Sequence, residues 1–307
     1  MDIGYAVFKG IVQGLGEFLP ISSTAHLVFT DAVMRRLGMP TPGHAEEEFF
    51  DILLHVGTLV AVVIYFRREL MAIFRLWLGR ANGQDEALSS QYASTLPLKQ
   101  LPVYLAVSVV MTVVLVKGVL AVSEPICQQL GLVQQGIHDL SEYYFHHPRF
   151  VALHLIITGF LLFGTQKFSD RLLARRDGAL KPVGMKNAVV IGLFQGCAAI
   201  FHGISRSGST ISGGLLSGLD RVSATRYSFL LSLPTFVLVT AYEGYKFSKT
   251  ANLAEYNWPA ALAGSAVAGL VGYYCVKYFL QYLAKNPLTP FAVYCWVMGA
   301  VMMVMLG

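Results

Sequence analysis

Charged residues are scarce in this chain: of its 307 residues, only 13% are Asp, Glu, Lys or Arg. An average soluble domain carries about a quarter. Hydrophobic residues make up 55%, and the mean hydropathy is +0.56. A chain this poor in charge and this rich in apolar side chains is not an ordinary soluble domain. We therefore expect a protein embedded in a lipid bilayer.

Cysteine is also rare, and its spacing excludes two kinds of site. The four cysteines lie far apart, without a CxxC pair and without a histidine at a ligand spacing: Cys127, Cys197, Cys275 and Cys295. Neither a structural zinc site nor a disulfide framework is indicated. We interpret them as packing residues.

A cleavable signal peptide is not apparent at the start of the chain. Asp2 is acidic, and the first apolar run is broken by Lys9 and Glu17, whereas a signal peptide begins with basic residues followed by an unbroken apolar stretch. We expect the N-terminus to be retained. The net charge of +5 does not predict a nucleic-acid partner, because the basic residues cluster at the ends of apolar runs, where membrane topology accounts for them.

The apolar stretches predict an all-α polytopic membrane protein. A bilayer core about 30 Å thick needs about 20 mostly apolar helical residues. Six stretches approach that length: 50–66, 100–122, 150–166, 227–245, 258–283 and 290–306. Two further regions, 3–38 and 187–220, are each broken midway by a polar or glycine-rich turn. Irregular backbone at membrane depth is tolerated where protein or a water-filled cavity surrounds it, so we expect two re-entrant hairpins around an internal cavity.

Basic residues predict the orientation. The segments after the first and third spans are rich in Lys and Arg and should be cytoplasmic: Arg67, Arg68, Arg75 and Arg80, then Lys167, Arg171, Arg175, Arg176, Lys181 and Lys186. The first hairpin then enters from outside and the second from the cytoplasm. Arg35 and Arg36 conflict with this arrangement, because it places them outside.

A sparse internal repeat favours the same arrangement. Residues 10–14 resemble 192–196, with Gln13 matching Gln195, and Ile-Ser recurs in the two turns. We predict one membrane domain, 1–307, in which a first repeat, 1–122, is joined by a connecting loop and helix, 123–186, to a second repeat, 187–307. Two such halves of opposite orientation form an inverted-topology repeat, whose site lies near the midplane where broken helices meet.

The turn of the second hairpin has the composition of an anion site. Hydroxyl groups, a guanidinium and the free amides of a helix N-terminus all favour phosphate oxygens. The candidate phosphate-binding residues there are Ser205, Arg206, Ser207, Gly208 and Thr210, and the first hairpin adds Gln13, Ser22 and Thr24 to them. A structural alternative is a helix cap plus an internal salt bridge between Glu17 and Arg206.

The first hairpin contributes the reactive groups. Ser22, Ser23 and Thr24 open a helix, and His26 follows Ser23 by three residues, so the imidazole is expected near a hydroxyl. His26 would take the hydroxyl proton or protonate the leaving oxygen. Glu17 would orient His26, act as a base or ligate a divalent cation, and these roles stay open.

Three more polar residues belong to the same region. Gln13 is expected to hydrogen-bond the broken backbone and to reach a ligand. Asp51 and His55, one helical turn apart, would either line the cavity mouth or mark the membrane interface, and the sequence favours neither.

The motifs resemble those of the bacterial undecaprenyl pyrophosphate phosphatase family, also called the bacitracin-resistance family. The similar segments are QGLGEFLPISSTAH at 13–26, FDILLHVGT at 50–58 and GISRSGSTISGG at 203–214. The resemblance covers most of the chain except 123–149. It implies six spanning helices with two re-entrant pairs, and hydrolysis of the C55 isoprenyl diphosphate to the monophosphate in the inner membrane, with the site facing the periplasm.

The resemblance also implies residue roles. Glu17 would be the essential acidic residue, Ser23 the nucleophile, His26 its acid–base partner and Arg206 the phosphate binder. A divalent cation, Mg²⁺ or Ca²⁺, would support activity, with Glu17 as a ligand. The expected partners are the lipid and the membrane, with a homodimer as an open alternative to a monomer.

This chain departs from the family pattern at three positions. Gln13 stands where many members have a second Glu, Gly16 where Thr is usual, and His202 where Pro is usual. Two other functions therefore stay open. Inverted repeats are common in transporters, so the same site would serve a transporter or flippase of phosphate or lipid phosphate. An inactive lipid-phosphate binder, spoiled by His202, is the third reading.

Overall fold

The computed structural model describes residues 2–38, 41–129, 147–174, 181–250 and 256–306, and over these residues it contains helices and no strand. The helices are α1 (Ile3–Gly16), α2 (Ser23–Arg36), α3 (His44–Tyr65), α4 (Arg67–Trp77), α5 (Gly83–Tyr92), α6 (Leu101–Gln129), α8 (Pro148–Ala174), α9 (Met185–Ile200), α10 (Arg206–Leu216), α11 (Arg221–Thr250), α12 (Trp258–Leu283) and α13 (Thr289–Met305). The predicted all-α class is confirmed.

Five of the six predicted spans are long and apolar enough to cross a membrane: α3, α6, α8, α11 and α12. The sixth, at 290–306, is the shorter apolar helix α13 of 17 residues. At 1.5 Å per residue it reaches about 25 Å, somewhat less than a bilayer core of about 30 Å.

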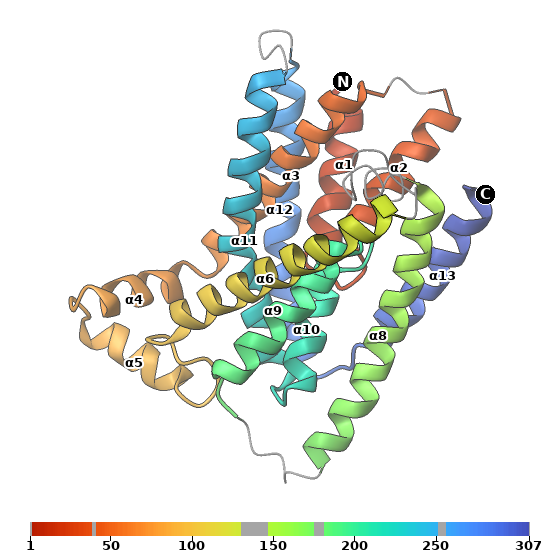
Figure 1. Ribbon diagram of the computed structural model, residues 1–307. Helices are drawn as coiled ribbons and strands as arrows, with labels where there is room; N and C mark the ends of the chain where they lie inside the picture. The colour runs from red at the N-terminus through yellow and green to blue at the C-terminus, as the bar shows by residue number, and fades with distance from the viewer. Residues whose placement is uncertain (1, 39–40, 130–146, 175–180, 251–255, 307) are drawn as a thin grey trace.

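Both interrupted regions fold as helical hairpins, α1–α2 and α9–α10. Figure 1 shows the first hairpin entering from the side that carries the N-terminus and the second from the opposite side. The inverted repeat of 1–122 and 187–307 stays a prediction. Of the connecting segment 123–186, residues 130–146 and 175–180 lie outside the described residues.

Each hairpin turn has one residue with positive φ. Ser22 has a φ of 66° and is the one non-glycine residue of this kind in the described part of the chain, while Gly203 has a φ of 94°. Strained backbone of this kind tends to occur at functional sites. Ser22 and Ser205 then cap α2 and α10, their hydroxyls accepting from the amides of Ala25 and Gly208.

Glycines let the first arm of each hairpin approach its neighbour closely. A Cβ on Gly10 would lie 2.4 Å from the Gly264 carbonyl oxygen on α12, and one on Gly192 would lie 2.5 Å from the Ser108 carbonyl oxygen on α6. Close backbone contact through small residues is the usual way in which membrane helices associate. It fixes α1 against α12 and α9 against α6, and so fixes the depth of both turns.

The basic segment after the first span differs from the predicted loop: it forms α4 and α5, which project to one side of the bundle (Figure 1). Arg35, whose position conflicted with the predicted topology, pairs with Glu47 at 2.5 Å, and Arg36 donates to the Met305 carbonyl. These partners account locally for both bases.

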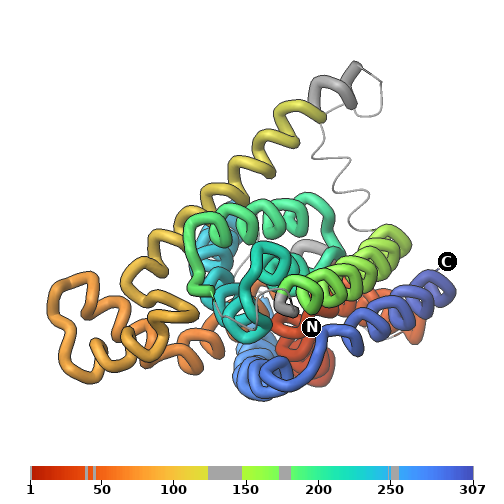
Figure 2. The backbone as a smooth tube through the Cα atoms, turned by 90° about the horizontal axis from the view of Figure 1, so that it is seen from below, coloured from red at the N-terminus to blue at the C-terminus, as the bar shows by residue number. Residues whose placement is uncertain are grey.

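Helix α6 runs along the rim of the bundle when the molecule is seen from below (Figure 2). Only 6% of its most apolar stretch is buried inside the protein.

Candidate active site

The two hairpin turns meet, and their charged residues pair. Arg206, the first residue of α10, places Nη2 2.5 Å from Oε1 of Glu17, which directly follows α1. The Ser207 hydroxyl also crosses between the hairpins and donates to the Leu19 carbonyl at 2.9 Å. Glu17 is almost fully buried, with 4% of its surface exposed. Because a buried carboxylate is unfavourable without partners, the guanidinium is a requirement of the fold as well as a feature of the site.

The second oxygen of Glu17 collects three neighbours. Oε2 accepts from Gln13 Nε2 at 2.8 Å and from the Ser23 hydroxyl at 3.0 Å, and lies 3.5 Å from Nε2 of His55. Gly16 makes the approach of Ser23 feasible, since a Cβ at this position would lie 2.9 Å from Ser23 Cα. The glycine that replaces the usual Thr thus borders the nucleophile candidate directly.

His26 has other partners than the expected Ser23. Its Nδ1 lies 2.8 Å from the Ser22 carbonyl oxygen, and its Nε2 lies 2.7 Å from the Tyr294 hydroxyl of α13, whose ring stacks on the imidazole at 5.6 Å. The carbonyl one turn back captures Nδ1 and turns the ring toward α13. Among the described residues, the hydrogen-bond partner of the Ser23 hydroxyl is therefore Glu17 rather than His26.

Most hydroxyls of the predicted phosphate cradle make internal hydrogen bonds. Ser205 accepts from the Gly208 amide and contacts the Ser207 hydroxyl, and Thr210 bonds the Arg206 carbonyl and Ser228. These side chains build the turn and hold it against the first hairpin. Ser22 is buried as a helix cap, whereas Thr24 is exposed.

Arg206 and Gln13 each keep a polar atom without a partner. Arg206 Nε and Gln13 Oε1 are buried and have no hydrogen bond within the described residues. The Arg206 guanidinium also lies 4.7 Å over the Phe236 ring of α11 and donates to the Ser228 carbonyl at 3.4 Å. An arginine that retains a buried donor is suited to receive a phosphate oxygen.

Sequence analysis missed Phe236 and Tyr294, and it left His55 undecided. The structure places His55 at the site, where its ring contacts Phe236 at 5.0 Å, and Asp51 one turn away in an ion pair with Lys9 at 2.8 Å. The motif around His55 was a usable signal. Phe236 and Tyr294 do not stand in a polar motif, so the sequence contains no signal that assigns either residue to the site.

Comparison with known proteins agrees with the motifs. Residues 6–301 match the family described as Bacitracin resistance protein BacA. The chain belongs to this family. Similar proteins named Undecaprenyl-diphosphatase include one from Halothermothrix orenii (32% identical, covering 100% of this chain and 99% of the relative), one from Thioalkalivibrio sulfidiphilus (34%, 98% and 97%) and one from Halorhodospira halophila (34%, 98% and 96%).

A divalent cation, which the resemblance of the motifs implies, would find oxygen donors at the turn. The Gln13 Oε1 atom is buried without a partner, and both Gln13 Nε2 and the Ser23 hydroxyl donate to the Glu17 carboxylate. The described residues contain no group of three or more His, Cys, Asp or Glu that would form a complete protein cage. One carboxylate, neutral oxygens and substrate phosphates match the way in which Mg²⁺ is usually bound.

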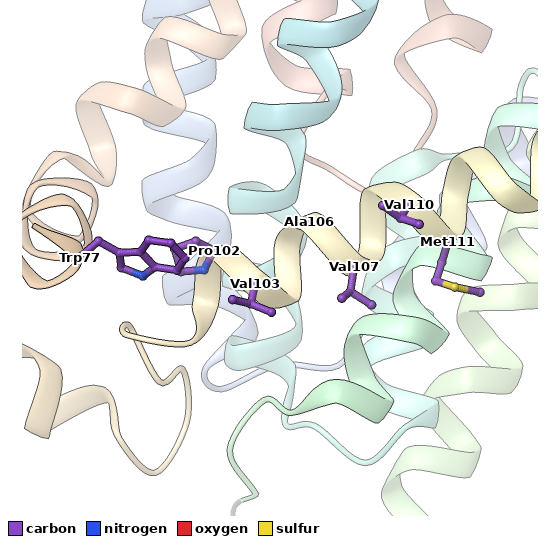
Figure 3. Close-up of a pocket in the computed structure, with 7 residues that line it drawn as sticks. All are labelled: Trp77, Pro102, Val103, Ala106, Val107, Val110 and Met111. Atoms are coloured by element: carbon purple, nitrogen blue, oxygen red, sulfur yellow. The ribbon is translucent and has the colours of Figure 1, made fainter.

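An apolar groove of about 340 Å³ lies away from these residues, along α6 (Figure 3). Its lining is Trp77, Pro102, Val103, Ala106, Val107, Val110 and Met111. A lining without acid, base or nucleophile cannot carry phosphoryl chemistry, and on a membrane protein of the BacA family it is suited to lipid contact. The polar side chains suited to such chemistry lie at the hairpin turns instead.

Proposed function

We propose that this chain is a membrane phosphatase that hydrolyses undecaprenyl diphosphate to undecaprenyl phosphate and phosphate, and so returns the lipid carrier to cell-wall synthesis. The observation that carries the proposal is the chain of contacts from the Ser23 hydroxyl through Glu17 to Arg206. These contacts place a nucleophile, a base and a phosphate binder side by side. The chain also belongs to the BacA family, and similar proteins are named Undecaprenyl-diphosphatase.

Binding begins with exchange of the Arg206 partner. The terminal phosphate of the substrate takes the guanidinium, using the unpaired Nε and the donors now held by Glu17. The amides that a helix N-terminus leaves unpaired favour the same anion at the start of α10. Glu17 then keeps its contact with Ser23 while Arg206 binds the phosphate, so that Oε2 stays in place to accept the hydroxyl proton.

Ser23 acts as the nucleophile and Glu17 as its base. The Ser23 oxygen bonds to the terminal phosphorus while the phosphorus–oxygen bond to the leaving undecaprenyl phosphate breaks, and the hydroxyl proton passes to Glu17. Glu17 then gives the serine proton to solvent. Water attacks the phosphorus of the phosphoserine and passes a proton to Glu17, the bond between the phosphorus and the Ser23 oxygen breaks, and Glu17 returns this proton to the serine oxygen as phosphate leaves. Positioning and charge neutralisation supply most of the catalysis in phosphoryl transfer.

A divalent cation belongs to the same proposal. Glu17 and Gln13 would hold it, and when bound it supplies neutralisation of phosphate charge. His26, whose Nε2 contacts the Tyr294 hydroxyl, would donate a proton to the leaving oxygen once the substrate takes the place of that contact.

Trapping the phosphoserine tests this mechanism. Purified protein given undecaprenyl diphosphate labelled in its terminal phosphate should release phosphate and, after rapid acid quench, carry label on the peptide that contains Ser23. Ser23→Ala should lose both signals. A burst of phosphate release without labelled protein would instead identify water as the direct nucleophile, and binding without any phosphate release would favour a transporter.

Location is part of the proposal. We place the protein in the bacterial inner membrane with the site reached from the periplasm. Support comes from the basic residues of α4, Arg67, Arg68 and Arg75, and from Lys167 and Arg171 in the C-terminal part of α8, the helix end that lies opposite the N-terminus in Figure 1.

A further inference from the structure

Phe236 contacts Arg206 and His55, the two basic side chains that approach Glu17 from outside the first hairpin. Its ring centroid lies 4.7 Å from the Arg206 guanidinium carbon and 5.0 Å from the His55 ring centroid. Arg206 and His55 in turn contact different oxygens of Glu17, at 2.5 and 3.5 Å. One ring on α11 therefore borders the side chains that approach the carboxylate from α10 and from α3.

The contact matters because the Arg206 guanidinium must be held in one orientation while its N–H donors stay available to the phosphate. A guanidinium has five N–H donors, and a hydrogen-bonding neighbour would occupy some of them. An aromatic face attracts the cation through its quadrupole and takes no donor. The ring thus fixes the plane of the guanidinium while Nε stays unpaired and the other donors face Glu17 and the Ser228 carbonyl.

We propose that Phe236 is a positioning residue for phosphate binding, which acts by holding the Arg206 guanidinium, with His55 beside it, in the orientation that accepts the substrate phosphate. Phe236 lies two residues after Pro234, which is inside α11. This inference rests on the phosphatase function proposed above and adds a residue from outside both hairpins to it.

The expected effect is on substrate affinity more than on the chemical step. A cation–π contact corresponds to a factor of about 3 to 30 in an equilibrium constant. Phe236→Met, which removes the ring and nearly keeps its volume, should raise KM for undecaprenyl diphosphate, and the inhibition constant of inorganic pyrophosphate, by about that factor. Phe236→Tyr, which keeps the aromatic face, should restore both constants to within about twofold of wild type.

Steady-state kinetics of the purified full-length protein test the proposal. The matched control is Tyr242→Met on the same helix, where the side chain is 67% exposed, and it should leave both constants unchanged. In an Arg206→Lys background, Phe236→Met should add less than twofold, because the ring acts through the guanidinium and coupled residues are not additive.

Two results would overturn the role of Phe236. One is an unchanged KM in Phe236→Met, and the other is an equal rise in Phe236→Met and Phe236→Tyr, which would mean that side-chain shape alone matters. Wild-type protein that releases no phosphate would be a failure of the phosphatase function itself, so the two failures are distinguished by the wild-type assay.

Discussion

Gln13 and Glu17 lie one helical turn apart and share a hydrogen bond at 2.8 Å. The Gln13 amide stands at the position where the family pattern often has a second carboxylate. The amide donates to Glu17 through Nε2 and leaves Oε1 buried without a partner. An oxygen in this state is favourable only when a cation or a donor faces it. The substitution in this chain therefore keeps an oxygen at the position while removing one negative charge from the turn.

Gln13→Glu should raise the affinity of the site for a divalent cation. A second carboxylate adds charge to the oxygen donors around Glu17, so we expect half-maximal activity at an at least about threefold lower Mg²⁺ concentration. The measurement is phosphate release during Mg²⁺ titration after treatment with EDTA, with Gln13→Leu as the control that lacks the oxygen. Identical Mg²⁺ titrations for all three proteins would show that Gln13 is not a cation ligand.

His202→Pro should leave turnover within about twofold of wild type. The His202 side chain is exposed, and its carbonyl, which accepts from Nδ1 of His154 at 2.5 Å, is kept in a proline. Phe201 before it has a ψ of 85°, outside the helical region that a following proline disfavours. Phosphate release by both proteins gives the comparison. A large gain in the proline variant would mean that His202 spoils the site.

At the scale of elements, α1, α2 and α3 are joined by a buried ammonium. Lys9 is fully buried, with Nζ 3.0 Å from Asp31, 2.8 Å from Asp51 and 3.9 Å from Glu47. The Tyr5 hydroxyl bridges Asp31 and Glu47. The Lys9–Asp51 pair lies one turn from Gln13 on α1 and one turn from His55 on α3. The same two helices that carry Glu17 and His55 are thus fixed by charge just above the site.

Lys9→Met should destabilise the protein severely. It leaves three carboxylates close together without their central cation, and removing one partner of a buried ion pair costs about 3–5 kcal/mol. Thermal unfolding in detergent should therefore occur at a clearly lower midpoint than in wild type. Lys186→Met, at an exposed lysine, is the control, and adding Asp31→Asn to Lys9→Met should recover part of the loss. An unchanged midpoint would show that the carboxylates need no cation.

At the scale of the whole molecule, one hairpin enters from each face of the bundle and reaches the middle (Figure 1). Lipid on both flanks leaves no solvent for Glu17 and Arg206 except inside the protein, which is why the two turns are buried against each other. The proposed periplasmic approach rests on the basic residues of α4 and of the C-terminal end of α8.

Cysteine labelling should reveal the orientation. In a variant without native cysteines, Gly43→Cys, at the N-terminal side, should react in intact cells with a maleimide that does not cross the inner membrane. Ser90→Cys, on the α5 side, should react only after lysis. Both positions are exposed. The opposite pattern would reverse the proposed topology, and reaction of both sites in intact cells would indicate dual insertion.

The spans, the two hairpins and the meeting of Glu17 with Arg206 were within reach of the sequence, because they depend on local properties. Runs of apolar residues fix helices in lipid, polar interruptions fix turns, and a buried carboxylate and guanidinium have few partners to choose from. Even the two ends of α13 lie one residue from those of the predicted span.

Only the tertiary structure decided which groups touch. Ser23 donates to Glu17 across the turn beside Gly16, and His26 turns to Tyr294, which is 268 residues away in the chain. Phe236 reaches Arg206 from a helix whose sequence carries no polar motif at that position. Hydropathy determined where each segment lies in the membrane, whereas a hydrogen bond of about 3 Å depends on how packed helices are placed about one another, and that is a property of the whole chain.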